Sequence, residues 1–353
     1  MDNKVYTVIG LMSGTSLDGV DMACCRFYQS GAWHYEIVAT RHVPYTSNWI
    51  QKLNDAFYLE PDQLDELDMD YGNYLGELVL EFINTSGLRP DLISSHGHTI
   101  FHRPEQGYTL QLGDGQIMSK ITALPLVNNF RQSDVAKGGQ GAPLVPVGDS
   151  LLFGDYGICL NIGGIANISY DQYGKRLAFD VCPANQVLNH LAGKAGLKYD
   201  ENGTLASAGN VLPDLLHELN ELDYYKKERP KSLGREWVGR VMLPILDQSQ
   251  ARLEDQLNTL CLHIAMQIGK ATNDMEKSTM LVTGGGAHNN FLIHSISQQI
   301  KHDITIPSVR LVDFKEAIVF AFLGLLRKLE HVNCLASVTG AYEDSCTGDL
   351  FMP

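Results

Sequence analysis

Apolar residues at the start of the chain gather in three runs separated by short turns. The runs Val5–Leu11, Val20–Phe27 and Trp33–Val43 have the length and the β-branched and aromatic content of strands. A strand, a tight turn and a second strand fit the first two runs. The chain therefore opens with three predicted strands.

Three longer segments have helical patterns instead. From about Pro61 to Thr85, leucines and aromatic residues return at every third or fourth position, and Gly87 and Pro90 follow as stop signals. Leu253–Thr272 is a second predicted helix, and Lys315–Leu329 is a third, largely apolar one. Shorter strands are predicted within Asp91–Thr99 and at Tyr108–Leu112, Leu124–Asn128 and Met280–Thr283.

The middle of the chain repeats the opening pattern. Gly157–Ile162 and Ile165–Tyr170 are apolar runs on either side of a glycine pair, and a third run, Arg176–Phe179, ends directly before Asp180. A helix is expected to start near Pro183 or Ala184. We interpret the repeat as an internal duplication, and a length of 353 residues also favours two domains.

The expected boundary between the domains is the crossover near Leu124–Pro146. This gives an N-terminal domain of residues 1–125, joined by the C-terminal tail from about 331 to 353, and a C-terminal domain of residues 126–330. No low-complexity linker separates the halves, so the boundary depends on the duplication.

Charge and composition exclude several classes of partner. Because the net charge is −14, we expect neither nucleic acid nor an anionic membrane as the main partner. We expect no secretory signal, because the N-terminus has no basic region followed by a long apolar one, and no membrane span, because no run of about 18 apolar residues occurs. The seven cysteines lack CxxC spacing and are typical of reduced thiols, so the expected location is the cytoplasm.

The turn after the first apolar run carries the chemistry of a phosphate site. Residues Gly14–Asp21 hold two glycines, two hydroxyls and two carboxylates. Glycine lets backbone N–H groups converge on an anion, hydroxyls add donors, and carboxylates can hold a hydrated metal ion. Taken alone, the motif favours an ordinary glycine–aspartate hairpin.

Two more glycine-rich turns, at Gly163-Gly164 and Gly284-Gly285-Gly286, also follow apolar strands. None of the three has the spacing of a Walker loop or of a Rossmann fingerprint. Each is a weak signal, but together they indicate a nucleotide held between two duplicated domains. Two hairpins on the phosphates and a third turn against the adenosine resemble the arrangement of the actin and sugar-kinase superfamily.

Longer strings make the resemblance more specific. MSGTSLDGVD at residues 12–21 and GGQGAPLVP at residues 138–146 match one family. Shorter matching strings lie at Ser95–Thr99, Gln111–Asp114, Asn129–Asp134, Asn161–Asn167, Phe179-Asp180, Gly284–Asn289 and Glu316-Ala317. On these residues the chain resembles the anhydro-N-acetylmuramic acid kinases, enzymes of bacterial peptidoglycan recycling. The resemblance implies an α/β fold of two duplicated actin-like, ribonuclease H-like domains with the active site in the interdomain cleft.

The resemblance also implies the reaction. ATP phosphorylates O6 of 1,6-anhydro-N-acetylmuramic acid while water opens the anhydro bridge at C1. Asp180 is implied as the general base for that water, and attack opposite the leaving oxygen implies inversion at C1. From the residues alone, Asp180 fits equally the role of N-cap for the following helix.

ATP and Mg²⁺ are the cofactors that the resemblance implies. The phosphates are expected at the first two glycine turns and the adenosine at the third. Asp18 is a candidate for holding Mg²⁺ through water, whereas Asp21 fits either that role or a structural acceptor. The expected nucleotide-binding residues are Gly14, Thr15, Ser16, Leu17, Asp18, Gly19, Val20, Asp21, Gly163, Gly164, Asn167, Gly284, Gly285, Gly286 and Asn289.

Three further residues are expected to contact the sugar. Arg131 offers a fork for the lactyl carboxylate of the substrate or for phosphate, with a surface ion pair as the alternative. Glu316 is implied as a sugar contact, and His96, together with His98, is expected near the sugar. No third ligand has metal-site spacing, so no zinc site is expected.

The chain departs from the family pattern beside the expected base. The family usually reads Asp-Thr-Gly-Pro-Gly-Asn where this chain reads Asp180-Val181-Cys182-Pro183-Ala184-Asn185. Other departures are Asn189 for an aspartate, Leu233 for a threonine and His98 for a glutamine. We interpret the chain as a subfamily variant. The alternatives are a kinase of the same fold with another sugar or acid acceptor, and a silent nucleotide-binding module. A homodimer is a family expectation.

Overall fold

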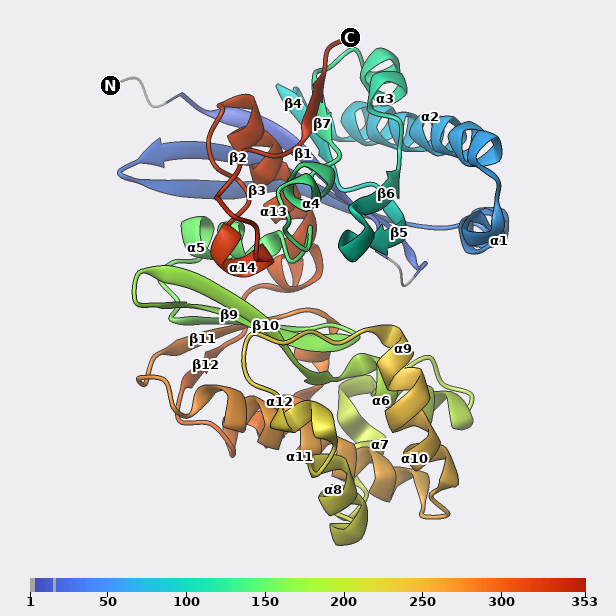
Figure 1. Ribbon diagram of the computed structural model, residues 1–353, viewed down its shortest axis with the longest axis vertical. Coiled ribbons are helices and arrows are strands. Elements are labelled where there is room, and N and C mark those ends of the chain that lie inside the picture. The colour runs from blue at the N-terminus through green and yellow to red at the C-terminus, as the bar shows by residue number, and fades with distance from the viewer. Residues whose placement is uncertain (1–3, 15–16) are drawn as a thin grey trace. The chain divides into compact units, whose positions relative to one another are not determined.

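The computed structural model describes residues 4–14 and 17–353, which form two compact units (Figure 1). The first unit comprises the chain up to Gly154 together with Phe314–Pro353, and the second comprises Asp155–Asp313.

The first unit is built on a sheet with the strand order β13-β7-β4-β1-β2-β3. Strands β1, β2 and β3 pair antiparallel, whereas β4 and β7 continue the sheet parallel to β1. The strands of this unit are β1 (Tyr6–Met12), β2 (Gly19–Ser30), β3 (Ala32–Pro44), β4 (Leu92–Ser95), β5 (His98–Arg103), β6 (Tyr108–Leu112), β7 (Leu126–Asn128) and β13 (Asp349–Phe351). Its α-helices are α1 (Ser47–Asp55), α2 (Pro61–Ser86), α3 (Gly115–Thr122), α4 (Gln132–Ala136), α5 (Val145–Leu152) and α14 (Ala336–Thr339).

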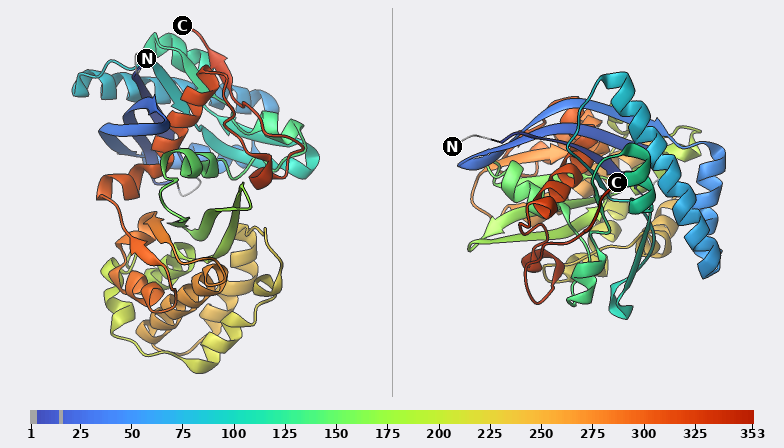
Figure 2. Two further views of the ribbon diagram at one scale, coloured as in Figure 1. Left: turned by 90° about the vertical axis from the view of Figure 1, so that its left-hand side faces the viewer. Right: turned by 90° about the horizontal axis from the view of Figure 1, so that it is seen from above.

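Helices cover both faces of this sheet. Ile9 and Leu11 of β1 pack into one core with leucines of α2. The other face lies against the long helix α13 (Val309–Lys328), which Figure 2 shows in red beside the blue strands. A Cβ on Gly10 would lie 1.9 Å from the carbonyl oxygen of Ala317, so only glycine permits this close approach.

The second unit has a sheet with the order β10-β9-β8-β11-β12. Its strands are β8 (Ile158–Ile162), β9 (Ile165–Gln172), β10 (Lys175–Pro183), β11 (Thr279–Thr283) and β12 (Asp303–Thr305). Its α-helices are α6 (Asn185–Lys194), α7 (Thr204–Ser207), α8 (Pro213–Asn220), α9 (Arg235–Trp237), α10 (Leu243–Gln248), α11 (Leu253–Thr272) and α12 (Asn290–Ser297). Leu160 and Val282 of the sheet share a core with Leu260 and Ile264 of α11.

The two sheets confirm the predicted duplication. In each, three antiparallel strands are followed by two parallel ones, in the orders β3-β2-β1-β4-β7 and β10-β9-β8-β11-β12. The expected ribonuclease H-like α/β architecture is therefore present in both units, once in each.

The units differ from the expected domain ranges. Strand β7 pairs parallel with β4, so the first unit continues beyond residue 125 and ends at Gly154. The chain returns to this unit at Phe314 rather than at about residue 331, because α13 packs on the first sheet. The tail adds β13, which pairs with β7.

Strand β10 also differs from its prediction. It continues through Asp180 to Pro183, and α6 begins only at Asn185. The N-cap interpretation of Asp180 is therefore wrong, since Ala184 occupies that position. Proline is tolerated at the end of β10 because β10 is an edge strand, where a missing N–H costs no ladder hydrogen bond.

Candidate functional site

The turn between β1 and β2 is described at Gly14 and from Leu17 onward, and the expected phosphate ligands Thr15 and Ser16 lie outside the described residues. The backbone N–H of Leu17 donates to the carbonyl of Gly14 at 3.4 Å, which closes the turn. Leu17 has a positive φ of 58°, an uncommon backbone state for leucine. Asp18 is exposed at the end of this turn.

A single exposed carboxylate fits the way proteins hold Mg²⁺, which keeps several waters and takes phosphate oxygens as further ligands. No group of three or more His, Cys, Asp or Glu side chains that could hold a metal occurs within residues 4–14 and 17–353. Asp18 lies outside any such group, and its expected contact with Mg²⁺ stays a prediction.

Two of the expected nucleotide-binding residues in β2, Val20 and Asp21, have contacts within the first unit. Val20 is fully buried in the core, so its side chain is unavailable to a ligand. The carboxylate of Asp21 lies 2.7 Å from Nδ1 of His42 on β3. Its negative charge also helps raise the pKa of Glu316 on α13, so the two acids are electrostatic neighbours.

Arg131 and His96 form a fixed pair in the first unit. Nδ1 of buried His96 donates to the carbonyl of Gly97 at 2.9 Å, so its Nε2 is an acceptor. Arg131 donates to that nitrogen from Nε at 3.2 Å and from Nη2 at 2.8 Å. A third bond, from Nη1 to the carbonyl of Gly141, is 2.7 Å long. Burial and the Arg131 charge hold the pKa of His96 well below its ordinary range, so the imidazole is neutral.

The positive charge of Arg131 acts on Glu316. Burial raises the pKa of Glu316, while the positive charges of Lys315 and Arg131 oppose the rise. Burial lowers the pKa of Arg131 to about 10, still far above neutrality. Arg131 is therefore a positively charged fork held by neutral acceptors, which suits it to an anionic group of a ligand.

The second unit brings two glycine turns together. A Cβ on Gly284 would lie 2.5 Å from Oδ1 of Asn161 and 2.8 Å from the carbonyl of Ile162, and its φ is +81°. The turn after β11 therefore packs directly on the end of β8, beside the Gly163-Gly164 hairpin. The hairpin carbonyls in turn accept backbone N–H bonds from Ala184 and Asn185 at the start of α6.

A row of polar residues crosses the sheet at this end. Asp180 of β10 pairs with Asn167 of β9, Asn167 pairs with Asn161 of β8, and Asn161 pairs with Thr283 of β11. Directly opposite residues point to the same face of a sheet. This row of paired residues runs from Asp180, the expected base, to the strand ends beside the Gly163-Gly164 hairpin.

Asp180 is held by a segment far along the chain. Its backbone N–H donates to the carbonyl of Lys231 at 3.0 Å, and its own carbonyl accepts from the hydroxyl of buried Tyr224. The backbone N–H of Leu233 donates to Oδ2 of Asp180 at 2.8 Å. Burial raises the pKa of the carboxyl, and the bond from Leu233 opposes the rise.

The altered segment after Asp180 fits its surroundings. Cys182 is fully buried, and burial raises the pKa of its thiol, so the thiol stays protonated. Neither Cys182 nor Ala184 has a positive φ. The backbone N–H of Ala184 still donates to the carbonyl of Gly164 at 2.9 Å. The added Cβ atoms are therefore accommodated without loss of the hairpin contact.

Asn289, an expected nucleotide-binding residue, has a structural role in the second unit. Its Oδ1 accepts from the backbone N–H of Leu292 at 2.9 Å and so caps α12. The sequence analysis missed Asn161, Tyr224 and His42 as members of the site. Register counting outward from the glycine hairpin could have found Asn161, but no sequence pattern marks Tyr224 or His42.

Comparison with known proteins agrees with the motifs. A model of the family described as anhydro-N-acetylmuramic acid kinase matches residues 6–353. The protein of that name from Francisella tularensis subsp. novicida is 35% identical, with 97% of each chain covered. That from Vibrio vulnificus strain CMCP6 is 34% identical, again with 97% of each chain covered.

Solved structures with a similar trace are more distant. A ROK family glucokinase from Streptomyces griseus in complex with glucose and AMPPNP has a TM-score of 0.41 at 12% identity, covering 90% of this chain and 99% of its own. The activator of the 2-hydroxyisocaproyl-CoA dehydratase from Clostridium difficile has a TM-score of 0.44 at 13% identity, covering 90% and 94%. At these scores neither likeness adds to the assignment.

Proposed function

The chain belongs to the anhydro-N-acetylmuramic acid kinase family, and we propose that it phosphorylates 1,6-anhydro-N-acetylmuramic acid with ATP while opening the anhydro ring. The product is N-acetylmuramic acid 6-phosphate, an intermediate in the recycling of cell-wall sugars. The full-length family match and the retained acid, arginine and glycine motifs support this activity over a silent nucleotide-binding module.

The proposed step joins hydrolysis to phosphoryl transfer. Water attacks C1 of the sugar, the bond between C1 and O6 breaks, and O6 takes the γ-phosphoryl group as ADP leaves. The carboxylate of Asp180 receives the proton of the attacking water. Because water enters opposite the departing oxygen, the configuration at C1 inverts.

The observation that carries the proposal is the setting of Asp180. One carboxylate oxygen, Oδ2, accepts from the Leu233 N–H, whereas Oδ1 has no hydrogen bond from the part of the chain that the structure describes. Burial raises the pKa of the carboxyl above its ordinary value, which makes the carboxylate a stronger acceptor for the proton of water. A half-buried acid with one fixed and one available oxygen suits a general base.

Residues of each unit are assigned to binding. We assign the positively charged fork of Arg131 to the lactyl carboxylate of the sugar or to phosphate, and Glu316 to a sugar hydroxyl. The turn at Gly14–Asp21 and the Gly163-Gly164 hairpin offer backbone donors for phosphates. Asp18 would hold Mg²⁺ through water, and the ion would neutralise part of the phosphate charge.

Isotope labelling tests the reaction. The purified protein is incubated with ATP, Mg²⁺ and the anhydro sugar in ¹⁸O water, and the product is weighed by mass spectrometry. A 6-phosphate with one heavy oxygen supports ring opening with phosphorylation. ADP release with an intact anhydro ring contradicts it and indicates a kinase for another acceptor. No sugar-dependent ADP release contradicts both.

Two expectations of the resemblance stay predictions. A homodimer is checked by light scattering of the purified protein. For the location, the structure contributes one finding: no helix in residues 4–14 and 17–353 has the length and apolar content to cross a membrane. The cytoplasm as compartment is checked by cell fractionation.

A further inference from the structure

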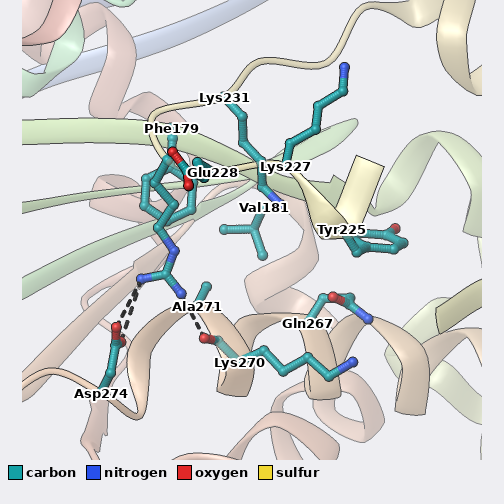
Figure 3. Close-up of a pocket in the computed structure, with 11 residues that line it drawn as sticks. Phe179, Val181, Tyr225, Lys227, Glu228, Lys231, Gln267, Lys270, Ala271 and Asp274 are labelled. Atoms are coloured by element: carbon teal, nitrogen blue, oxygen red, sulfur yellow. Dashed lines mark hydrogen bonds and ion pairs between the residues drawn. The ribbon is translucent and has the colours of Figure 1, made fainter. Parts of the chain in front are cut away.

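The second unit contains a pocket on the face of β10 opposite to Asp180. Its volume is about 390 Å³, and it lies between β10, helix α11 and the segment Tyr225–Lys231 (Figure 3). Phe179 and Val181 of β10 line it, and they flank Asp180 in sequence. Phe179 precedes the bulge that follows Asp180, so its side chain and the carboxylate of Asp180 point to opposite faces of the strand.

One part of the lining of this pocket is apolar. Phe179, Val181 and Ala271 supply aliphatic and aromatic surface, and the ring of Tyr225 forms a further wall. The Tyr225 hydroxyl is engaged with Nε2 of buried His263 at 2.9 Å. The ring therefore meets the pocket while its polar end is directed into the protein. The aromatic or aliphatic part of a small molecule could pack against these side chains and leave water.

The rim of the pocket is predominantly cationic, although the chain carries a net charge of −14. Lys227, Arg229, Lys231 and Lys270 line it against two acids, Glu228 and Asp274. Such a local excess of positive charge opposes the general field of the molecule. It indicates an anionic ligand rather than a neutral or cationic one.

Three of these cations, Lys227, Lys231 and Lys270, have no carboxylate within ion-pair distance in the described part of the chain, whereas Arg229 contacts Asp274. Lys231 donates to the carbonyl of Tyr224 at 3.1 Å, and its ammonium lies 4.4 Å from the centre of that ring. No carboxylate lies within ion-pair distance of Lys231 or Lys270 among the residues that the structure describes. Burial and the neighbouring charges of Arg229 and Lys227 lower the pKa of Lys231, a repulsion that a bound anion would relieve.

Arg229 is already oriented along the wall. Its Nη2 donates to the carbonyl of Lys270 at 2.7 Å, and its guanidinium lies 5.1 Å from the centre of the Phe179 ring. Its contacts with the carboxylate of Asp274 are long, at 3.4 and 3.5 Å. A charge-assisted bond is normally shorter, at about 2.7–2.9 Å, so a phosphate or carboxylate can compete for this group.

We propose that this pocket binds a small organic anion, in which a phosphate or carboxylate meets Arg229, Lys231 and Lys270 and an apolar or planar body packs on Phe179, Val181 and Tyr225. The volume lies within the range of small-molecule sites, about 300–1,000 Å³. None of the residues assigned to ATP or to the sugar lines the pocket, so the inference does not depend on the proposed reaction.

Calorimetric titration with phenyl phosphate, in the absence of sugar and with a non-hydrolysable ATP analogue present, tests the proposal. Phenyl phosphate should bind at least roughly tenfold more tightly than inorganic phosphate, because only the aryl ester has a ring to pack on Phe179, Val181 and Tyr225. Equal affinities, or saturable binding of neither, would overturn the proposal and leave an adventitious ion only.

Matched variants locate the binding. The double variant Arg229→Gln, Lys270→Gln should weaken the affinity for phenyl phosphate by roughly fivefold to tenfold. Lys198→Gln removes one positive charge from an exposed position of the second unit that does not line the pocket, and should change nothing. Equal weakening by Lys198→Gln would overturn a specific site.

A measurement on the unaltered protein guards against misfolded variants. Crystals of the full chain soaked with 4-bromophenyl phosphate should give an anomalous bromine signal beside Phe179 and Val181. A bromine signal elsewhere, with none in the pocket, would overturn the proposal even if the double variant fails to fold.

Discussion

The two sheets share one strand order, yet the acids proposed to act in each unit are held in different ways. Asp180 of the second unit is fixed by backbone groups of residues 231 and 233 and by the Tyr224 hydroxyl. Glu316 of the first unit lies instead among charged side chains. The charges of Lys315 and Arg131 lower its pKa, and those of Asp21 and Asp149 raise it.

The difference follows from where each acid stands. Asp180 lies on an edge strand, whose free backbone groups can pair with an irregular segment. Glu316 lies on a helix, whose backbone groups are already paired, so only side chains can surround it. Burial raises the pKa of both acids, but only at Glu316 do nearby cations oppose the rise. Burial is thus the largest influence on the pKa of both acids, and neighbouring charged side chains adjust it further only at Glu316.

Asp180→Asn should give the largest effect. The amide cannot accept the proton of water, so kcat should fall about 10²–10⁴-fold, measured as sugar-dependent ADP release. In the wild type, kcat/KM should fall as the pH falls through the raised pKa of Asp180, because the base must be ionised.

Stability of the same variant provides the control. The pKa of Asp180 is higher in the folded chain than the ordinary value of 3.8, so protonation stabilises the fold below that value and this contribution is lost as the pH rises through the folded pKa. At neutral pH, Asp180→Asn should therefore melt at the same temperature as the wild type or higher. A lower melting temperature at pH 7 would mean that the lost activity reflects damage to the fold.

Arg131→Met should have the next largest effect, in the first unit. It removes the fork assigned to the substrate anion and leaves Nε2 of buried His96 without its donor. The KM for the sugar should rise about 10–100-fold, and the free energy of unfolding should fall by about 1–3 kcal/mol.

Arg131→Lys separates charge from geometry in this prediction. Lysine keeps the positive charge near Glu316 but cannot reach His96 and Gly141 together as the fork does. It should recover part of the affinity for the sugar. An unchanged KM in Arg131→Met would remove Arg131 from the substrate site.

Much of the architecture could be predicted from the sequence. Glycine turns after apolar runs marked the two duplicated openings, and periodicity marked α2 and α11 nearly to their ends. Strand pairing was harder, since the alternation of a strand does not tell which strand lies beside it. The end of β10 was placed too early because Pro183 was interpreted as a helix start; in the structure it pairs with Ile165 across a bulge.

The surroundings of the site could be predicted only in part. The family strings supplied Asp180, Arg131 and Glu316 as expected site residues, with no indication of what holds them. The contact of Tyr224 with Asp180 joins residues 44 positions apart through a segment without periodicity. No local pattern encodes such a contact, because it depends on how the irregular segment lies along the edge strand.

Gly284→Ala tests whether the glycine turn of the second unit requires glycine. The new Cβ would meet Oδ1 of Asn161 at 2.5 Å, and alanine would have to adopt a φ of +81°. The free energy of unfolding should fall by about 1–3 kcal/mol, measured by denaturant titration. Gly285→Ala is the matched control, since its Cβ would only touch Nδ2 of Asn185 at 3.5 Å. Equal losses in both variants would contradict the role assigned to the close contact.

Tyr224→Phe should have the smallest effect and makes the comparison sharpest. It removes one donor to the backbone of Asp180 and no charge, so kcat should fall about threefold to tenfold, with the acid limb of the pH profile displaced. Tyr225→Phe is the neighbouring control, because its hydroxyl contacts His263 and not Asp180. That control should lower the melting temperature, by leaving Nε2 of His263 unpartnered, and keep the pH profile. If both variants shift the pH profile alike, the pKa of Asp180 depends on the stability of the whole Tyr224–Leu233 segment and not on the Tyr224 hydroxyl. The contact between Tyr224 and Asp180 would then not control the base.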